Sequence, residues 1–212
     1  IIDRRMAQMQ AEGVTFKTNV TVGSQDYVAG VANTSTETIS ADELKAQFDA
    51  VILGIRAFNV VDELKYKNKI LFDYVNNGGN LIIQYNTANN LTTKEIAPFE
   101  LKLSNERVTD ENAKVTFLAP NHKVLNQPNK ITEKDFLGWV QEQGLYYPNK
   151  WSAEFIPIIA SNDEGETPKH GGLLIAKYGK GNYIYTGLSF FRELPEGVCG
   201  AYRLLANMIA LE

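Results

Sequence analysis

The sequence contains few of the residue types that most catalytic and metal sites require. Its 212 residues include one cysteine, Cys199, and two histidines, His122 and His170. A single cysteine cannot form an internal disulfide, and two histidines far apart in the chain do not make a zinc site. The cysteine set of an iron–sulfur cluster is missing as well. We therefore expect no metal and no cofactor.

Basic clusters and long apolar runs are also scarce. The formal net charge is −4, and the densest basic stretches, Lys65–Lys69 and Lys177–Lys180, are short and interrupted. Nucleic-acid binding needs a clustered basic face, so we expect no nucleic-acid partner. No apolar run approaches the roughly 20 residues of a membrane span. The sequence therefore predicts a soluble chain without a membrane partner.

What remains is an ordinary globular composition, with 44% hydrophobic and 22% charged residues. This composition and length predict a single domain over residues 1–212. The chain opens on Ile1-Ile2-Asp3-Arg4 without an initiator methionine. This start predicts that the natural one was removed, or that the chain is a piece of something longer.

The hydrophobic pattern predicts an α/β fold. Asp49–Ile55 and Asn80–Tyr85 are apolar runs of strand length, which is typical of buried parallel strands. Asp62–Asn76, between them, has helical periodicity and is followed by two glycines. Such a strand–helix–strand unit makes a right-handed crossover in a parallel sheet. We therefore expect an open, mainly parallel sheet flanked by helices.

Further elements are predicted on both sides of this unit. Ser40 and Glu43 form a capping-box pattern, and Gly179 and Gly181 mark a hairpin turn. The remaining expected elements are helices at Arg4–Glu12, 41–47 and 197–210, a loop or hairpin at Gly23–Ser40, and strands at Val14–Val20, Lys114–Leu118, Phe155–Ile159, Gly172–Tyr178 and Asn182–Thr186.

The first quarter of the chain resembles a known family. Residues 2–20 and 39–53 are similar to a segment of the small, flavin- and NADPH-binding subunit of glutamate synthase. Dinucleotide binding needs a G-x-G-x-x-G turn between a strand and a helix, and this chain has none. The matching segment lies between the nucleotide fingerprints of that subunit, so the resemblance implies no FAD or NADPH. One hypothesis is therefore that the chain is a fragment related to such an oxidoreductase but without its cofactor motifs.

Residues 54–212 resemble a different family. The motifs are Gly54–Asn59, Asn77–Thr87, Asp135–Tyr146 and Tyr178–Pro195. They are similar to the C-terminal amidotransferase-like domain that follows the deacetylase domain in large bacterial PIG-L/LmbE-type proteins. This resemblance implies a flavodoxin-like three-layer sandwich of the class I glutamine amidotransferase type. It also implies a neighbouring deacetylase domain as a partner.

The two resemblances meet near Leu53. They predict a chimera, engineered or recombined, of two α/β folds joined at an equivalent strand, with no native function of its own. One natural family that covers the whole chain is the alternative. The chain also begins on a helix where amidotransferase-like domains open with a strand. The sheet is therefore expected to lack one strand and to expose an edge, which predicts a homodimer formed through that edge.

Glutaminase chemistry is not expected. An amidotransferase nucleophile is a cysteine on the turn after a strand, and Asn86-Thr87-Ala88 occupies that place. We expect Cys199 to be a packed or idle thiol. His122 resembles a structural turn residue of amidotransferase-like domains. A cysteine-independent hydrolase of ThuA-like type remains the enzymatic alternative, with Glu193 and Asp135 as its acid and base candidates.

A binding surface is the remaining functional prediction. In open α/β sheets, ligands meet the carboxyl ends of the strands. The polar residues expected there are Arg56, Asn59, Gln84, Asn86, Ser189 and Arg192, flanked by Trp139, Tyr146, Tyr147 and Trp151. This mixture suits a carbohydrate, through amide hydrogen bonds and ring stacking. The alternative is that the polar residues form a buried network and that the aromatic residues belong to the core.

Overall fold

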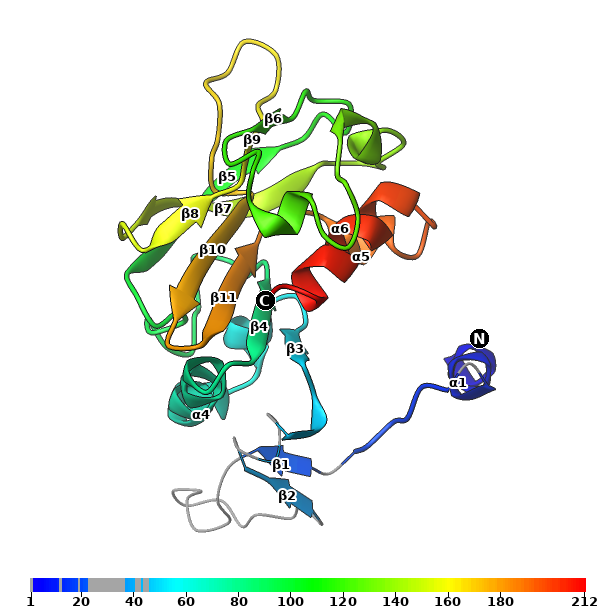
Figure 1. Ribbon diagram of the computed structural model, residues 1–212, viewed down its shortest axis with the longest axis vertical. Helices are drawn as coiled ribbons and strands as arrows, with labels where there is room; N and C mark the ends of the chain where they lie inside the picture. The colour runs from blue at the N-terminus through cyan, green and yellow to red at the C-terminus, as the bar shows by residue number, and fades with distance from the viewer. Residues whose placement is uncertain (1, 12, 19, 23–36, 41–42, 44–45) are drawn as a thin grey trace.

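The computed structural model describes residues 2–11, 13–18, 20–22, 37–40, 43 and 46–212. The predicted helix at 41–47 and most of the predicted loop at 23–40 lie outside these residues. Figure 1 shows a mixed sheet with helices on both sides of it. None of the helices among the described residues is long and apolar enough to cross a bilayer.

A five-stranded sheet forms the centre of the fold. Its strand order is β3 (Ala50–Leu53), β4 (Asn80–Gln84), β11 (Gly181–Thr186), β10 (Leu173–Tyr178) and β8 (Phe155–Pro157). The pairs β3–β4 and β4–β11 are parallel, whereas β11–β10 and β10–β8 are antiparallel. The predicted α/β class is confirmed in this coarse sense. The sheet is mixed because the β10–β11 hairpin reverses the chain direction at Gly179, whose φ is +58°.

Helix α4 (Leu64–Asn76) connects β3 to β4 and covers one face of the sheet. The predicted strand–helix–strand unit is therefore present. Val75 packs with Leu81 and Ile83 of β4 in one core cluster, which also includes Tyr183 and Tyr185 of β11. Alternate residues of a strand point to opposite faces, so these side chains all lie on the α4 side.

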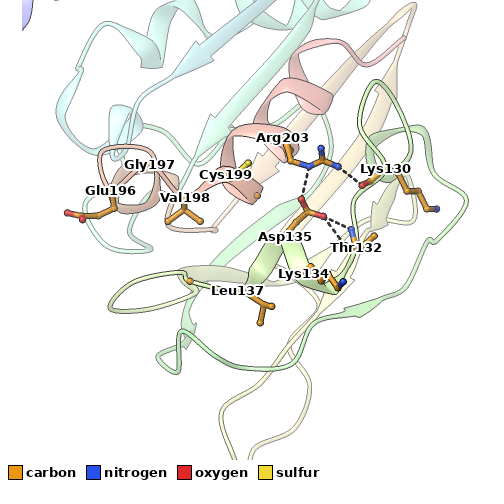
Figure 2. A pocket seen from close by; sticks show the side chains of 12 residues that line it. Lys130, Thr132, Lys134, Asp135, Leu137, Glu196, Gly197, Val198, Cys199 and Arg203 are labelled. Carbon is orange, nitrogen blue, oxygen red and sulfur yellow. Dashed lines mark hydrogen bonds and ion pairs between the residues drawn. The ribbon is translucent and has the colours of Figure 1, made fainter.

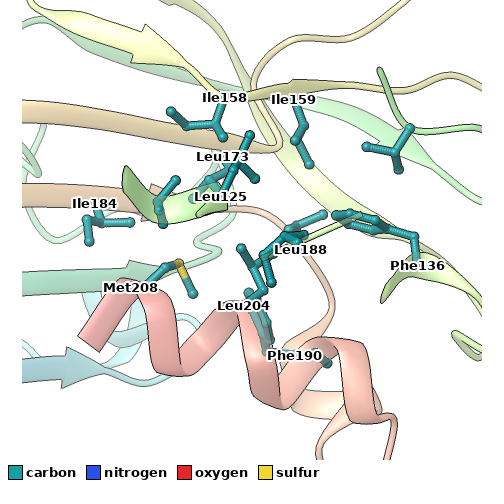
Figure 3. Close-up of a cluster of buried hydrophobic side chains, with 14 of the residues drawn as sticks. Leu125, Phe136, Ile158, Ile159, Leu173, Ile184, Leu188, Phe190, Leu204 and Met208 are labelled. Atoms are coloured by element: carbon teal, nitrogen blue, oxygen red, sulfur yellow. The ribbon is translucent and has the colours of Figure 1, made fainter. Parts of the chain in front are cut away.

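Helix α6 (Cys199–Ile209) covers the other face, and it is the helix that was predicted at 197–210. Figure 3 shows Leu204 and Met208 packed beneath Ile184 and Leu173 of the sheet. The two core clusters therefore lie on opposite sides of the same strands. The shorter helices are α3 (Ala57–Val60), α5 (Phe190–Glu193), and the 3-10 turns η1 (Lys123–Leu125) and η2 (Glu133–Phe136).

The middle of the chain contains strands that the sequence reading missed. β5 (Leu101–Val108) pairs with β7 (Gly144–Trp151) in a two-stranded antiparallel sheet with several register shifts. β7 includes Tyr146, Tyr147 and Trp151, which were expected to flank a binding surface and were assigned to no strand. The predicted strand at Phe155–Ile159 is split into β8 and β9 (Ile159–Ala160), and β9 pairs with β6 (Thr116–Phe117).

The N-terminal segment does not join the central sheet. α1 (Ile2–Ala11) is followed by an extended stretch, and β1 (Val20–Val22) pairs in parallel with β2 (Glu37–Ile39) in a sheet of their own. The strand predicted at Val14–Val20 is wrong for residues 14–18, which lie in no strand. The capping box is confirmed: Ser40 N donates to Glu43 Oε2 at 2.7 Å, and Glu43 N donates to Ser40 Oγ at 3.2 Å.

His122 has the structural role that its turn motif suggested, and this role predicts a pH dependence. Its Nδ1 accepts a hydrogen bond from Val124 N at 3.2 Å and so caps η1. Burial lowers the pKa of His122 below its ordinary value of 6.5. The neutral ring therefore stabilises the fold above about pH 6.5, and this stabilisation is lost as the pH falls toward the lower folded-state value.

We expect His122→Asn to keep the cap, because asparagine is a good N-cap residue, and to remove this part of the acid sensitivity. Urea midpoints of both proteins at pH 7.5 and pH 5 measure the effect. A wild-type midpoint that falls no more than that of the variant would contradict the assignment.

Candidate functional site

Aromatic side chains gather just beyond the carboxyl end of β4. Tyr85 is 7% exposed, and its carbonyl oxygen accepts a hydrogen bond from Arg56 N at 2.8 Å. Its ring stacks on that of Tyr146, with centroids 5.6 Å apart and planes 25° apart. Phe191 approaches the same ring at 5.3 Å and 56°. Tyr146 and Phe191 are half-buried, so they form the outer part of the group.

Three arginines surround these rings. The guanidinium of Arg107 lies over Tyr146, 5.7 Å from its centroid, and that of Arg192 lies over Phe191 at 4.8 Å. Burial raises the pKa of Tyr85, while the positive charges of Arg56 and Arg192 oppose the rise. We call Tyr85, Tyr146, Phe191, Arg56, Arg107 and Arg192 together the Tyr85 cluster.

The arginines of the Tyr85 cluster differ in their ion pairing. Arg192 pairs with Glu142, with Nε and Nη2 at 3.2 and 3.0 Å from Oε1, and Nη1 donates to the side-chain oxygen of Gln141. Within the described part of the chain, Arg56 and Arg107 have no carboxylate partner. The cluster therefore carries uncompensated positive charge, although the whole chain has a net charge of −4.

The backbone around the cluster is strained. Arg56, Gln141 and Tyr146 have φ values of 57°, 67° and 53°, which are three of the four positive values at non-glycine residues in the described chain. Residues with a Cβ rarely adopt this backbone conformation, because it costs about 1–3 kcal/mol for each residue. Strain of this kind concentrates at ligand-binding and active sites, and here Arg56 and Tyr146 belong to the cluster itself while Gln141 contacts its Arg192.

The structure places only part of the predicted surface in this cluster. Arg56 and Arg192 belong to it, and Gln84 is half-buried immediately before Tyr85. Asn86 is fully buried, and its Oδ1 accepts from Phe58 N at 2.8 Å. The side chain of Asn59 is bonded to the loop after β4. It donates to the carbonyls of Thr87 and Asn89 and accepts from Thr87 N. These two asparagines hold the loop after β4.

The aromatic residues predicted to flank the surface lie mostly in the core. Trp139 is 3% exposed, packs on Phe136 and Phe190, and donates from Nε1 to Asp135 O at 2.9 Å. Tyr147 is fully buried. Trp151 packs against the hydrophobic core on the α4 side of the sheet. Tyr146 is the flanking residue that reaches the site. For Trp139, Tyr147 and Trp151, the core reading fits the structure.

Ser189 and Glu193 form a buried network under the 140–143 loop. Both are fully buried. Glu193 accepts from Val140 N at 3.0 Å, and its other oxygen lies 3.1 Å from Ser189 Oγ, which donates to Glu142 O at 2.5 Å. Burial raises the pKa of Glu193. This carboxyl supports the loop that carries Gln141 and is closed off from any substrate.

Asp135 and Cys199 border an open cavity of about 520 Å³, and none of its lining residues belongs to the Tyr85 cluster. Figure 2 shows Asp135 held there between Arg203 and Thr132. Cys199 is exposed at the first position of α6, and no histidine lines the cavity. Among the residues described, no group of three His, Cys, Asp or Glu side chains is suited to a metal ion.

Sequence reasoning missed Tyr85, Arg107, Gln141, Glu142 and Phe191. Tyr85 was read as the end of a buried strand, and Arg107 lies on a strand that was not expected. The adjacent positions Gln141 and Glu142 lie within a motif that was quoted only for its family resemblance. No local pattern brings these segments together, because they lie far apart in the sequence; Arg107, for example, reaches Tyr146 through the β5–β7 pairing.

Comparison with known proteins gives a likeness of fold. No protein-family model and no curated protein matches the chain. The cytoplasmic protein STM3548 from Salmonella typhimurium is 16% identical, with a TM-score of 0.52 over 80% of this chain and 73% of that one. At this identity the likeness concerns the fold alone, and it agrees with the mixed α/β architecture.

Two other solved structures have lower scores. The cytoplasmic protein STM1381 from Salmonella typhimurium LT2 is 15% identical, with a TM-score of 0.48 over 81% of this chain and 74% of that one. A beta-galactosidase from Rahnella sp. R3 is 14% identical, with a TM-score of 0.45 over 98% of this chain. The chain spans 33% of the length of that enzyme.

Proposed function

We propose that this chain is a non-catalytic binding module of amidotransferase-like fold that takes an acidic carbohydrate at the Tyr85 cluster. The observation that carries the proposal is the gathering of Arg56, Arg107 and Arg192 around stacked rings at the carboxyl end of β4. Open α/β sheets bind their ligands at this edge. Left-handed backbone at three surrounding positions is consistent with a site under functional constraint.

The uncompensated arginines favour an anionic group in the ligand. Glu142 neutralises Arg192, whereas Arg56 and Arg107 have no carboxylate partner in the described chain. A guanidinium presents a planar fork of N–H donors that matches a carboxylate in two parallel hydrogen bonds. A carboxylate on the ligand would therefore supply the charge that the cluster lacks.

The rest of the cluster favours a sugar bound by hydrogen bonds more than by stacking. Arginines already lie over the rings of Tyr146 and Phe191, so these ring faces are less free for a sugar than the sequence suggested. The side-chain amide of Gln141, which accepts a hydrogen bond from Arg192, supplies further donors for hydroxyl groups. A uronic acid combines both kinds of group in one small ring.

The absence of turnover is part of the proposal. A hydrolase without cysteine needs a carboxyl group that reaches the substrate. Glu193 is fully buried with both oxygens engaged, and Asp135 is paired with Arg203. These contacts favour structural roles for both candidates. From the sequence resemblance, we also propose that the module accompanies a PIG-L-type deacetylase domain.

Calorimetric titration with D-glucuronate and D-glucose tests this function, because the two sugars differ at one carbon, which bears a carboxylate or a hydroxymethyl group. We expect glucuronate to bind with a roughly millimolar Kd and glucose to show no measurable binding. Arg56→Ala should weaken glucuronate binding by about tenfold or more, since it removes a charge-assisted hydrogen-bond donor. Arg4→Ala, an exposed arginine on α1, is the matched control and should have no effect.

Equal binding of glucose would contradict the role of the arginines. No binding of either sugar at saturating millimolar concentrations would reject the carbohydrate proposal as a whole.

A further inference from the structure

Among the described residues, no strand pairs with the outer edge of β3. β3 lies at one end of the five-stranded sheet, and its described partner is β4. None of its four residues is buried, and Ile52 is 41% exposed. Phe48 precedes the strand in the sequence and is 46% exposed, and Ile55 follows it and is 37% exposed. A strand in this position presents unpaired N–H and C=O groups that can pair with a further strand.

The opposite edge of the sheet is protected in a way that β3 is not. β8 ends in Pro157, which has no N–H to donate and discourages strand addition. Its Phe155 is 3% exposed. β3 consists of Ala50-Val51-Ile52-Leu53 and has neither proline nor a charged residue. Of the two edges, β3 is therefore the one suited to pairing.

The chain also contains a strand-like segment without a sheet. Residues 14–18 alternate apolar and polar side chains, and Val14 and Phe16 are 40% and 39% exposed. The segment makes no ladder with the described residues; Val14 N donates to Met9 O, and Lys17 forms an exposed ion pair with Glu37 at 3.0 Å. Figure 1 shows α1 and this segment leading away from the central sheet.

We propose that two copies of this chain form a dimer in which residues 14–18 of each copy add to the β3 edge of the other. Each copy carries one open edge and one unpaired strand, so a two-fold exchange satisfies both at once. The exchange also covers Ile52, Val14 and Phe16, which are apolar side chains that a monomer leaves in water. The inference does not depend on the Tyr85 cluster.

Light scattering coupled to size exclusion, from micromolar to millimolar concentration, tests the dimer on the full chain. We expect a concentration-dependent dimer. Ile52→Lys places a charge on the edge, and Phe16→Asp places one on the donated strand. Each should raise the dimer dissociation constant by about tenfold or more. Circular dichroism checks that both variants are folded, and Phe16→Asp alters a segment outside the sheet, so it serves even if Ile52→Lys unfolds.

Ile156→Lys is the matched control, because Ile156 is 45% exposed on β8, the other edge strand of the same sheet. It should leave the dimer intact. Mixing Ile52→Lys with Phe16→Asp should recover a dimer, since the mixture retains one intact strand and one intact edge. A monomeric wild type at millimolar concentration would overturn the proposal. Loss of the dimer in Ile156→Lys would overturn it as well. So would a dimer that persists in both Ile52→Lys and Phe16→Asp.

Discussion

Replacing Glu193 with alanine should destabilise the protein by about 2–4 kcal/mol. The variant leaves Val140 N–H without its acceptor and leaves a cavity under the 140–143 loop. In a chain of this size, this loss lowers the melting temperature by about 2–4 °C for each kcal/mol. Thermal and urea unfolding at pH 7 measure the effect.

Glu193→Gln is the control, because it can keep the hydrogen bonds of Glu193 while it removes the ionisable carboxyl group. Its amide oxygen can accept from Val140 N, and its NH₂ can donate to Ser189 Oγ, so we expect little loss of stability. Burial raises the pKa of Glu193. The part of its stability contribution that depends on the proton is therefore complete below its ordinary pKa of about 4.5 and is lost as the pH rises through the higher folded-state value, whereas the hydrogen bond from Val140 N does not need the proton.

The stability of Glu193→Gln relative to wild type should consequently increase between pH 4 and pH 7. Stability curves that stay parallel over this range would contradict the assignment of Glu193 as a buried group that favours its proton. A Glu193→Gln variant as unstable as Glu193→Ala would contradict the hydrogen-bond geometry.

The second large effect is expected at Gly200. α6 crosses η2 so closely that a Cβ on Gly200 would lie 1.8 Å from Asp135 O and 2.4 Å from its carbonyl carbon. Both are backbone atoms, so the clash cannot be relieved by a side-chain movement. We expect Gly200→Ala to cost about 3 kcal/mol or more, measured by urea unfolding.

Gly54→Ala is the matched substitution, because a Cβ there meets nothing within 4 Å. It should leave stability unchanged or raise it by about 0.4–1 kcal/mol, through the reduced entropy of the unfolded chain. If the two variants are equally stable, the close packing of α6 on η2 is wrong.

The elements with strong local patterns were predicted well. The apolar runs at β3 and β4, the amphipathic α4 between them, the β10–β11 hairpin and the final helix α6 all occur where the hydrophobic period placed them. The run at 49–55 was nevertheless expected to be a buried strand, whereas Ile52 is 41% exposed. An apolar run of this kind is typical of a strand with a neighbouring strand on each side, whereas β3 pairs with one strand, β4, among the described residues.

The site was harder to predict because distant segments form it. Tyr85, Tyr146 and Phe191 come from three distant parts of the chain, and Tyr146 lies on β7, a strand that was not expected. The β5–β7 pair has register shifts and includes Pro148, which weaken the alternation that identifies strands. Arg56 and Arg192 were predicted because each lies within a few residues of the carboxyl end of a predicted strand. Trp139 was misplaced because composition does not distinguish an aromatic residue at a site from one in the core.

If the Tyr85 cluster is a binding surface, an NMR titration of the isotopically labelled chain with D-glucuronate should show the ligand there. We predict saturable shifts of the backbone amides of Arg56, Gln141 and Tyr146, with no shift at Trp139 or Ile52 and none anywhere with D-glucose. Shifts confined to residues outside the cluster, or no shift with glucuronate at saturating millimolar concentrations, would contradict this role of the cluster.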